Sequence, residues 1–412
     1  MKLKRAISLI MLVIIAMALI SCGKKKEAAI TPTPTPVEEV ATPTPIVTAA
    51  PTPTIAEVPE GMVKSYLTGE YVPEEIGRRR PIAVMINNAK VAVPQAGIAN
   101  AGVVYEAAVE GGITRLMTIT EDYDNLEKIG SMRSCRNYYI FYAAGFDAIY
   151  VHYGQAVYAL DVLDLPQVNN LSGLAGYGES VFYRTSDRKA PHNAYTSYEG
   201  IQRGIEICGY SQEYQEDYQG SYVFATDDNP VELPGEWEAK TVEPGYSIND
   251  ARFEYNEEDG LYYRFQYGDK QIDELTNEQL AYKNVLIQYS TWRNYDENGY
   301  LDIDVDKGNK GVYITNGKAI EVNWDKKTPW GATNYYDNDG NQIVMNQGKT
   351  WVCIIQDTYK DRVIIGSGNP LPSEPYQSGD NTPASSESVP AADGPNVIAP
   401  EPINDDGIEY VG

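Results

Sequence analysis

The sequence predicts two folded domains, an α/β or α+β domain over residues 62–220 and a mainly antiparallel β domain over residues 221–366. Three observations support this fold class. Strand-like and helix-like segments alternate in the first half, and turn dipeptides separate short alternating runs in the second. Hydrophobic residues make up 42% of the 412 residues, which is enough for about two domains. The predicted boundary lies between residues 217 and 247, where three prolines interrupt the periodicity.

The N-terminus has the pattern of a bacterial lipoprotein signal peptide. Lys2, Lys4 and Arg5 precede a short apolar run over residues 7–20, and Cys22 follows directly after Ser21. We therefore expect residues 1–21 to be removed and Cys22 to be lipidated. The lipid would hold the protein on the extracytoplasmic face of the cell membrane. The alternative is an uncleaved transmembrane anchor.

Two segments of biased composition flank the predicted domains. Residues 22–61 contain repeated Thr-Pro pairs, which cannot build a core and favour an extended, disordered stalk. Residues 367–412 are rich in Pro, Ser, Asp and Glu, which predicts a disordered acidic tail.

In the first domain the pattern predicts strands and helices in the order β-α-β-α-β. The helix over residues 99–110 is predicted with Asn100 as its cap and Gly111-Gly112 as its stop. The order favours a sheet with parallel pairs. The predicted elements are a strand at 81–86, a helix at 99–110, a strand at 113–120, a helix at 134–145 and a strand at 148–152.

In the second domain, dipeptides that favour positive φ predict tight hairpins and an antiparallel meander. They are Asp259-Gly260, Asn298-Gly299, Asn316-Gly317 and Asp339-Gly340. The last of them lies in a segment, residues 337–341, that is similar to the start of a calcium loop. That segment lacks the Glu that a calcium loop has at its twelfth position, so a hairpin turn is the better interpretation.

Several ordered motifs resemble the YerB-like lipoproteins of Gram-positive bacteria. They are RPIAVMINN (80–88), VYEAAVEGGITRLMTI (104–119), IGSMRSCR (129–136), FDAIYVHYG (146–154), RKAPHNAYTS (188–197) and YYDNDGNQIVMNQGKTWVCII (335–355). The resemblance implies a lipid-anchored two-domain protein, and it implies no reaction because the family has no assigned biochemical function. The family commonly has Ala at the position of Cys135, so a chemistry shared by the family cannot depend on that thiol.

Charge and cysteine content exclude some classes of function. The formal net charge of −25 argues against nucleic acid as a partner, because phosphate binding needs clustered Lys and Arg. With Cys22 lipidated, Cys135, Cys208 and Cys353 remain, so at least one thiol must be free within the monomer. Two neighbouring arginines would lower the pKa of Cys135, although a small residue packed in a helix is the favoured explanation. We expect neither a metal nor a cofactor, because no zinc spacing or glycine-rich phosphate loop is present.

Candidate site residues concentrate in the first domain, near the ends of predicted strands. Guanidinium, imidazole and amide groups are suited to binding carboxylate or phosphate, which predicts an anion site. The alternative is that each residue has a structural role. The candidates are Asn87, Asn88, Arg133, Arg136, His152, Arg188, His192 and Asn193.

Two acidic residues and the aromatic composition complete the predictions. Glu106 and Glu110 lie four apart in the predicted helix, which places both carboxylates on one side. They are candidates for a glycosidase pair, but ion pairing with Arg115 or Arg136 explains them more simply.

The 33 tyrosines, against 6 phenylalanines, suit either a surface that binds sugars or peptides or an aromatic core.

Two function classes follow. The first is a non-catalytic envelope lipoprotein that binds a cell-wall glycan or a membrane-protein partner. The second is an envelope hydrolase or transferase that acts on an anionic glycan or phosphodiester. In it, His152 or His192 would be the general base, and Arg133 and Arg136 would stabilise negative charge. The two histidines and two arginines would have to line one open pocket for the second class to hold.

Overall fold

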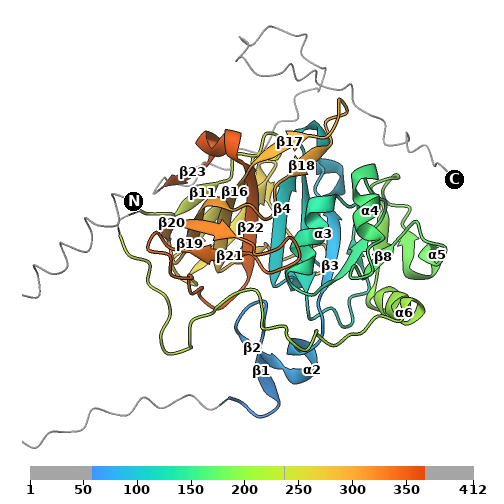
Figure 1. The fold of residues 1–412 in the computed structure, drawn as a ribbon, viewed down its shortest axis with the longest axis horizontal. Coiled ribbons are helices and arrows are strands. Elements are labelled where there is room, and N and C mark those ends of the chain that lie inside the picture. The colour runs from blue at the N-terminus through green and yellow to red at the C-terminus, as the bar shows by residue number, and fades with distance from the viewer. Residues whose placement is uncertain (1–57, 236, 367–412) are drawn as a thin grey trace, which may run out of the picture. The chain divides into compact units, whose positions relative to one another are not determined.

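The structure is a computed structural model that describes residues 58–235 and 237–366 (Figure 1). The predicted signal peptide, Cys22, most of the stalk and the acidic tail lie outside the described residues. No helix within the described part of the chain is long and apolar enough to cross a membrane.

A ten-stranded mixed sheet forms the centre of the fold (Figure 1). Residues 62–220 and 221–366 supply five strands each, and the two sets meet where β22 pairs with β4 in parallel. In spatial order the strands are β21 (Asn334–Tyr336), β20 (Lys318–Asp325), β19 (Asn309–Thr315), β16 (Asn284–Ser290), β22 (Thr350–Gln356), β4 (Val103–Ala108), β5 (Thr114–Thr120), β3 (Ile82–Asn87), β7 (Ile149–His152) and β8 (Asn170–Ser172).

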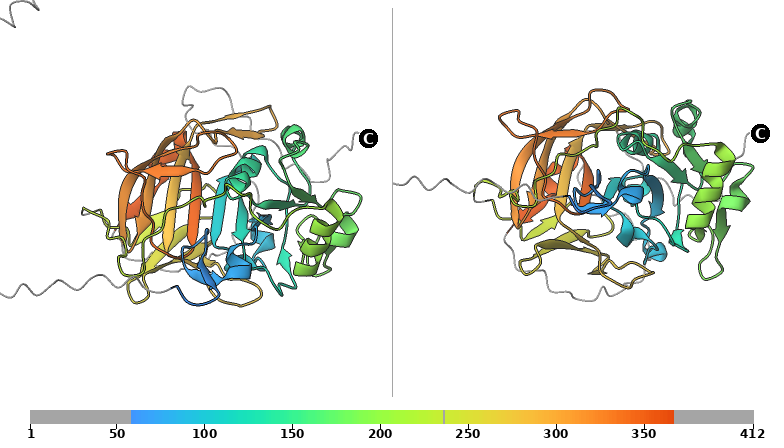
Figure 2. Two further views of the ribbon diagram at one scale, coloured as in Figure 1. Left: turned by 60° about the horizontal axis from the view of Figure 1, so that its bottom comes forward. Right: turned by 90° about the horizontal axis from the view of Figure 1, so that it is seen from below.

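Both faces of the central sheet are covered. One face packs against a second, antiparallel sheet and α6, with Val84 and Val285 in the same core cluster as Phe253. The opposite face packs against α3, where Met85 and Leu286 share a cluster with buried tyrosines of that helix. Figure 2 shows the second sheet (yellow) and α3 (green) on opposite sides of the central sheet.

The second sheet consists of β14 (Asp269–Lys270), β13 (Leu261–Gln266), β12 (Arg252–Asn256), β11 (Thr241–Glu243) and β23 (Ile364–Gly366), with β15 (Ala281–Tyr282) paired to β13. Three small sheets are β1 (Met62–Lys64) with β2 (Tyr71–Pro73), β6 (Ile129–Gly130) with β10 (Ala194–Thr196) and β9 (Phe182–Arg184), and β17 (Trp292–Asn294) with β18 (Leu301–Ile303).

The helices are short. Ser197 caps α6 by accepting a hydrogen bond from the backbone N–H of Gly200, and Gly209 ends the helix in the left-handed conformation. The α-helices are α2 (Glu74–Gly77), α3 (Asn137–Ala144), α4 (Leu160–Leu163), α5 (Gly178–Val181) and α6 (Tyr198–Cys208). The 3-10 helices are η2 (Lys90–Ala92), η3 (Ile98–Asn100), η4 (Glu110–Gly112), η5 (Val157–Ala159) and η6 (Asp357–Arg362).

One predicted element is wrong. Residues 99–110 are not a helix with Asn100 as its cap, because η3 ends at Asn100 and the strand β4 follows it. Because β4 is buried between β22 and β5, its residues need not alternate between polar and apolar, and such a run cannot be distinguished from a helix by periodicity. Three strands of the central sheet, β3, β4 and β5, therefore precede α3, and β5 is antiparallel to both of its neighbours.

The other element predictions agree with the structure. The strands at 81–86, 113–120 and 148–152 and the helix at 134–145 correspond to β3, β5, β7 and α3, and β3 and β7 are parallel. The predicted turns join β12 to β13, β17 to β18 and β19 to β20, and Asp339-Gly340 turns the chain after β21. The second half is mainly antiparallel, as predicted. The position of the domain boundary stays a prediction.

Candidate functional site

Seven strands of the central sheet run in the same direction and so end at one edge, which we call the carboxyl edge. They are β20, β16, β22, β4, β3, β7 and β8. Ligands of open α/β sheets commonly bind at such an edge. Asn87 ends β3, His152 ends β7 and Glu110 follows β4, while Arg115 is the second residue of the antiparallel β5 at the same edge.

Three arginines and one glutamate gather at the carboxyl edge, and we call Arg115, Arg133, Arg136 and Glu110 the arginine cluster. Arg136 forms a two-pronged ion pair with Glu110, in which Nε donates to Oε1 over 2.8 Å and Nη2 donates to Oε2. Arg115 Nη1 donates to the carbonyl oxygen of Ser134 over 2.5 Å. The ion pair of Glu110 with Arg136 was one of the simple explanations that the sequence suggested.

The arginine cluster carries more positive than negative charge. Burial, together with the positive charges of Arg136 and Arg133, lowers the pKa of Arg115 to about 9. Although burial opposes ionisation of Glu110, its hydrogen bonds to Arg136 hold its pKa below the ordinary value. Arg115 and Glu110 are therefore both ionised near neutral pH. Arg133 is half-buried, whereas Arg115 and Arg136 are buried, so Arg133 is the most exposed of the three arginines.

Glu106 lies apart from Glu110, in a buried polar network between the two large sheets. It is fully buried and accepts a hydrogen bond from Arg264 Nη2 over 2.6 Å. Its other oxygen accepts hydrogen bonds from Asn249 Nδ2, Thr114 Oγ1 and, at 3.3 Å, Asn88 Nδ2. The prediction that Glu106 and Glu110 face one side of a helix is wrong, since both belong to the strand β4 and the turn after it. The geometry gives no support to a glycosidase pair.

His152 is a framework residue. Its side chain is fully buried, Nδ1 donates to the carbonyl oxygen of Gly154 over 2.8 Å, and Nε2 lies 3.3 Å from Asn170 Oδ1. Burial lowers the pKa of His152 below its ordinary value. Such a histidine cannot reach a substrate, so the structure gives no support to it as a general base.

The remaining candidates lie around the end of β3 and the β9–β10 hairpin. Asn87 Nδ2 lies 2.9 Å from Nδ1 of the half-buried His192. Asn193 Nδ2 donates to the carbonyl oxygen of Thr185 over 2.7 Å. Asn88 belongs to the Glu106 network described above. Because Asn87 pairs with Arg115 in the β3–β5 register, the Asn87–His192 pair adjoins the arginine cluster.

Arg188 donates hydrogen bonds to two backbone carbonyls and one tyrosine. It donates to the carbonyl oxygens of Ala92 and Pro94 and to the hydroxyl of Tyr195, at 3.1, 2.8 and 2.7 Å. These contacts hold the segment after β3 against β10.

The thiols and tyrosines are used mainly inside the fold. Cys135, Cys208 and Cys353 are all free, and burial raises the pKa of Cys135 to about 12, against the effect of the neighbouring arginines. The suggestion of an activated thiolate is therefore wrong.

Tyr105, Tyr138 and Tyr142 are among many fully or almost fully buried tyrosines, which supports the core role of this residue type.

No group of His, Cys, Asp and Glu side chains within the described residues could hold a metal ion. In the turn that is similar to a calcium loop, Asp337 Oδ1 accepts backbone hydrogen bonds from Asp339 and Asn341, both over 2.9 Å. That carboxylate thus stabilises the hairpin turn.

A cavity of about 370 Å³ opens at the carboxyl edge, beside the arginine cluster. Its floor is the ends of β4 and β22, and its walls come from η4, η6 and the β17–β18 hairpin, which lies at the top of Figure 1. Sequence reasoning identified only Glu110 among its lining residues. Trp292, from the β17–β18 hairpin, and Tyr359, from η6, line it too. They are about 65 residues apart, and no local sequence pattern indicates that they meet.

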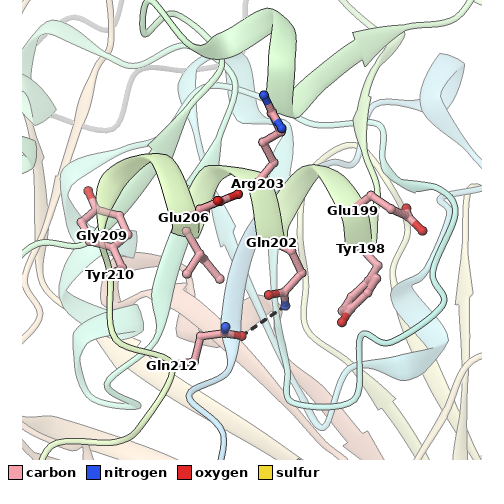
Figure 3. A pocket seen from close by; sticks show the side chains of 9 residues that line it. Tyr198, Glu199, Gln202, Arg203, Glu206, Gly209, Tyr210 and Gln212 are labelled. Carbon is pink, nitrogen blue, oxygen red and sulfur yellow. Dashed lines mark hydrogen bonds between the residues drawn. The ribbon is translucent and has the colours of Figure 1, made fainter.

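A second hollow lies on the surface of α6 and contains none of the predicted site residues (Figure 3). It is open and shallow, with a volume of about 900 Å³. Gln202 donates to Gln212 over 3.1 Å, while Arg203 projects from another side of the helix (Figure 3). Its polar groups do not converge, so the carboxyl edge is the better candidate site.

Comparisons with known proteins agree with the motifs found in the sequence. Residues 67–211 match the family described as "Protein of unknown function (DUF3048) N-terminal domain" and residues 242–352 match its C-terminal domain. The chain is 31% identical over 311 residues to "Putative lipoprotein YerB" of Bacillus subtilis (strain 168), covering 74% of this chain and 90% of that protein. The crystal structure of YerB from the same organism superposes with a TM-score of 0.66 at 30% identity, covering 74% of this chain and 99% of that chain.

Proposed function

The chain belongs to the DUF3048 family. We propose that it is a lipid-anchored protein of the cell envelope that binds an anionic ligand without transforming it. Two facts support the anchor. The sequence has the basic, apolar and cysteine segments of a lipoprotein signal, and the Bacillus subtilis relative has the name "Putative lipoprotein YerB". The lipid would be attached to Cys22, with the folded part outside the membrane.

The observation that carries the ligand-binding proposal is the arginine cluster. Three guanidiniums gather with one carboxylate at the carboxyl edge of a chain whose formal net charge is −25. Guanidinium groups match the geometry of carboxylate and phosphate oxygens, so the cluster is suited to an anion. The half-buried Arg133 is the most exposed of the three arginines.

Binding is favoured over catalysis by the surroundings of the candidate catalytic groups. His152 is buried and engaged, Glu106 is paired with Arg264, and Glu110 is paired with Arg136. A general base must come within hydrogen-bond reach of the substrate proton, which His152 and Glu106 cannot do from their buried positions. The hydrolase or transferase alternative therefore has less support.

The anchor is tested by substitution of the lipidated cysteine. Cys22→Ala should abolish incorporation of a labelled fatty acid, because the lipid is attached through that thiol. Cys208→Ala, which removes another thiol, is the matched control and should be labelled like the wild type. Equal labelling of the Cys22→Ala variant would contradict the anchor.

Ligand binding is tested by thermal stability of the detergent-solubilised protein with poly(glycerol phosphate) and with wall-glycan fragments. A ligand that binds the native state raises the melting temperature, because the stability gain is RT ln(1 + [L]/Kd). Arg133→Gln should lose this gain, measured against the melting temperature of the same variant without ligand. Arg203→Gln, on the exposed surface of α6, is the control and should keep the gain. The proposal fails if no anionic polymer stabilises the wild type, or if the Arg133→Gln variant gains as much as the wild type.

A further inference from the structure

The cavity at the carboxyl edge has an aromatic wall. The rings of Trp292 and Tyr359 have centroids 5.9 Å apart and planes tilted by 36°. Trp292 Nε1 donates to Thr358 Oγ1 over 2.8 Å, and the guanidinium carbon of Arg362 lies 3.9 Å from the centroid of the Tyr359 ring. Both rings are therefore held in place without a ligand, which lowers the entropy cost of binding one.

The opposite wall is open backbone with hydrogen-bonding groups. Gly111 and Gly112 both have positive φ, at 71° and 75°, and no atom lies within 4 Å of the position where Gly111 would carry a side chain. A ligand can thus approach this backbone closely. Glu110, Asn294 and Gln356 also line the cavity and supply carboxylate and amide oxygens.

The charge inside the cavity limits what can bind there. Glu110 is the only charged side chain among the described residues that line it, and Arg136 already neutralises that carboxylate with two hydrogen bonds. An anion would have no cation among the lining side chains, since Arg362 contacts Tyr359 and Ser247 but is not one of them, and a cation would find its carboxylate already paired. The cavity therefore favours a neutral ligand with one apolar face and several hydroxyl groups.

We propose that this cavity is a saccharide-binding site, in which a neutral pyranose ring stacks on Trp292 and Tyr359 and its hydroxyl groups bond to Glu110, Asn294 and Gln356. A volume of about 370 Å³ is within the usual range of ligand pockets and has room for one or two sugar rings. The aromatic face supplies contact area, and the fixed polar groups set the orientation of the ring.

The saccharide site shares Glu110 with the arginine cluster, but it does not need an anion to bind there. The link between the two does rest on the proposed function. Glu110 lines the cavity and binds Arg136, so the two sites are adjacent. One anionic glycan could place a neutral sugar in the cavity and its phosphate or carboxylate on the arginine cluster.

The test is isothermal titration of the full-length protein in a detergent that has no sugar headgroup. The probe is the neutral disaccharide of N-acetylglucosamine, with choline chloride as a cationic probe. Wild type should bind the disaccharide, and Trp292→Ala should bind it about tenfold more weakly because one stacking face is lost. Trp237→Ala removes an exposed tryptophan outside the cavity and should bind like the wild type.

Three results would overturn the saccharide site. They are binding of choline in place of the disaccharide, absence of disaccharide binding in the wild type, and unchanged affinity in Trp292→Ala. If Trp292→Ala is misfolded, Asn294→Ala is the second variant. Asn294 is exposed, so this substitution removes only a hydrogen-bonding group, and it should also weaken binding. Since the probe is neutral, these results do not depend on whether anionic polymers bind to the arginine cluster.

Discussion

Replacement of Arg264 by methionine should destabilise the protein strongly. Arg264 is fully buried and donates to the fully buried Glu106 over 2.6 Å, and it joins the second sheet to the centre of the first. Its guanidinium carbon lies 4.8 Å from the Phe253 ring and 4.7 Å from the Trp351 ring. Methionine fills part of this space but leaves the carboxylate of Glu106 without its cation.

The magnitude follows from what remains around Glu106. Loss of one partner from a buried ion pair costs about 3–5 kcal/mol, since the other charge stays buried. The side chains of Asn249, Thr114 and Asn88 would still donate hydrogen bonds to Glu106. The loss in free energy of unfolding should therefore stay below the upper end of this range. The carbonyl of Phe265 would also lose the donor Arg264 Nη1. We therefore expect the free energy of unfolding to fall by about 4 kcal/mol.

Urea denaturation followed by tryptophan fluorescence measures this change. Arg293→Met is the matched control, because Arg293 pairs with Asp302 while 76% of its side chain is exposed, and it should cost about 1 kcal/mol or less. The double variant Glu106→Gln with Arg264→Met should be more stable than Arg264→Met alone, because no unpaired charge is buried. A loss below about 1 kcal/mol for Arg264→Met would refute the reasoning.

Two further predictions concern buried titratable groups. Burial raises the pKa of Glu121 to about 7, so the native state binds its proton more tightly than the unfolded chain does. The free energy of unfolding should therefore fall by up to about 3 kcal/mol from pH 4.5 to 7 relative to Glu121→Gln, and parallel pH curves for the two proteins would contradict this. Because Cys135 is buried with a raised pKa, iodoacetamide should modify the half-buried Cys208 first in the native protein, as mass spectrometry of peptides would show.

The sequence predicts local structure well where local rules decide it. The hairpin at Asn316-Gly317 needs two consecutive residues with positive φ, and both have it, at 49° and 73°. The strand β4 could not be identified in this way, because its burial is set by β22, which is about 250 residues away in the sequence. Tertiary context overrides periodicity at this position.

The candidate site was predictable only in part. The sequence predicts Arg133 and Arg136 near strand ends but places Glu110 in a helix, and the structure brings all three together with Arg115. By contrast, the partner of Glu106 comes from the second sheet, since Arg264 lies 158 residues later. No spacing rule predicts such a pair, because it depends on how the two sheets pack.

Hydrogen–deuterium exchange with and without poly(glycerol phosphate) locates a bound anion on the chain. An anion at the arginine cluster should slow exchange at residues 131–137 and 110–112, where the arginine cluster meets the cavity. Slowed exchange confined to α6 and its surface hollow, or no change anywhere in the folded part under conditions where the polymer binds, would contradict binding at the arginine cluster.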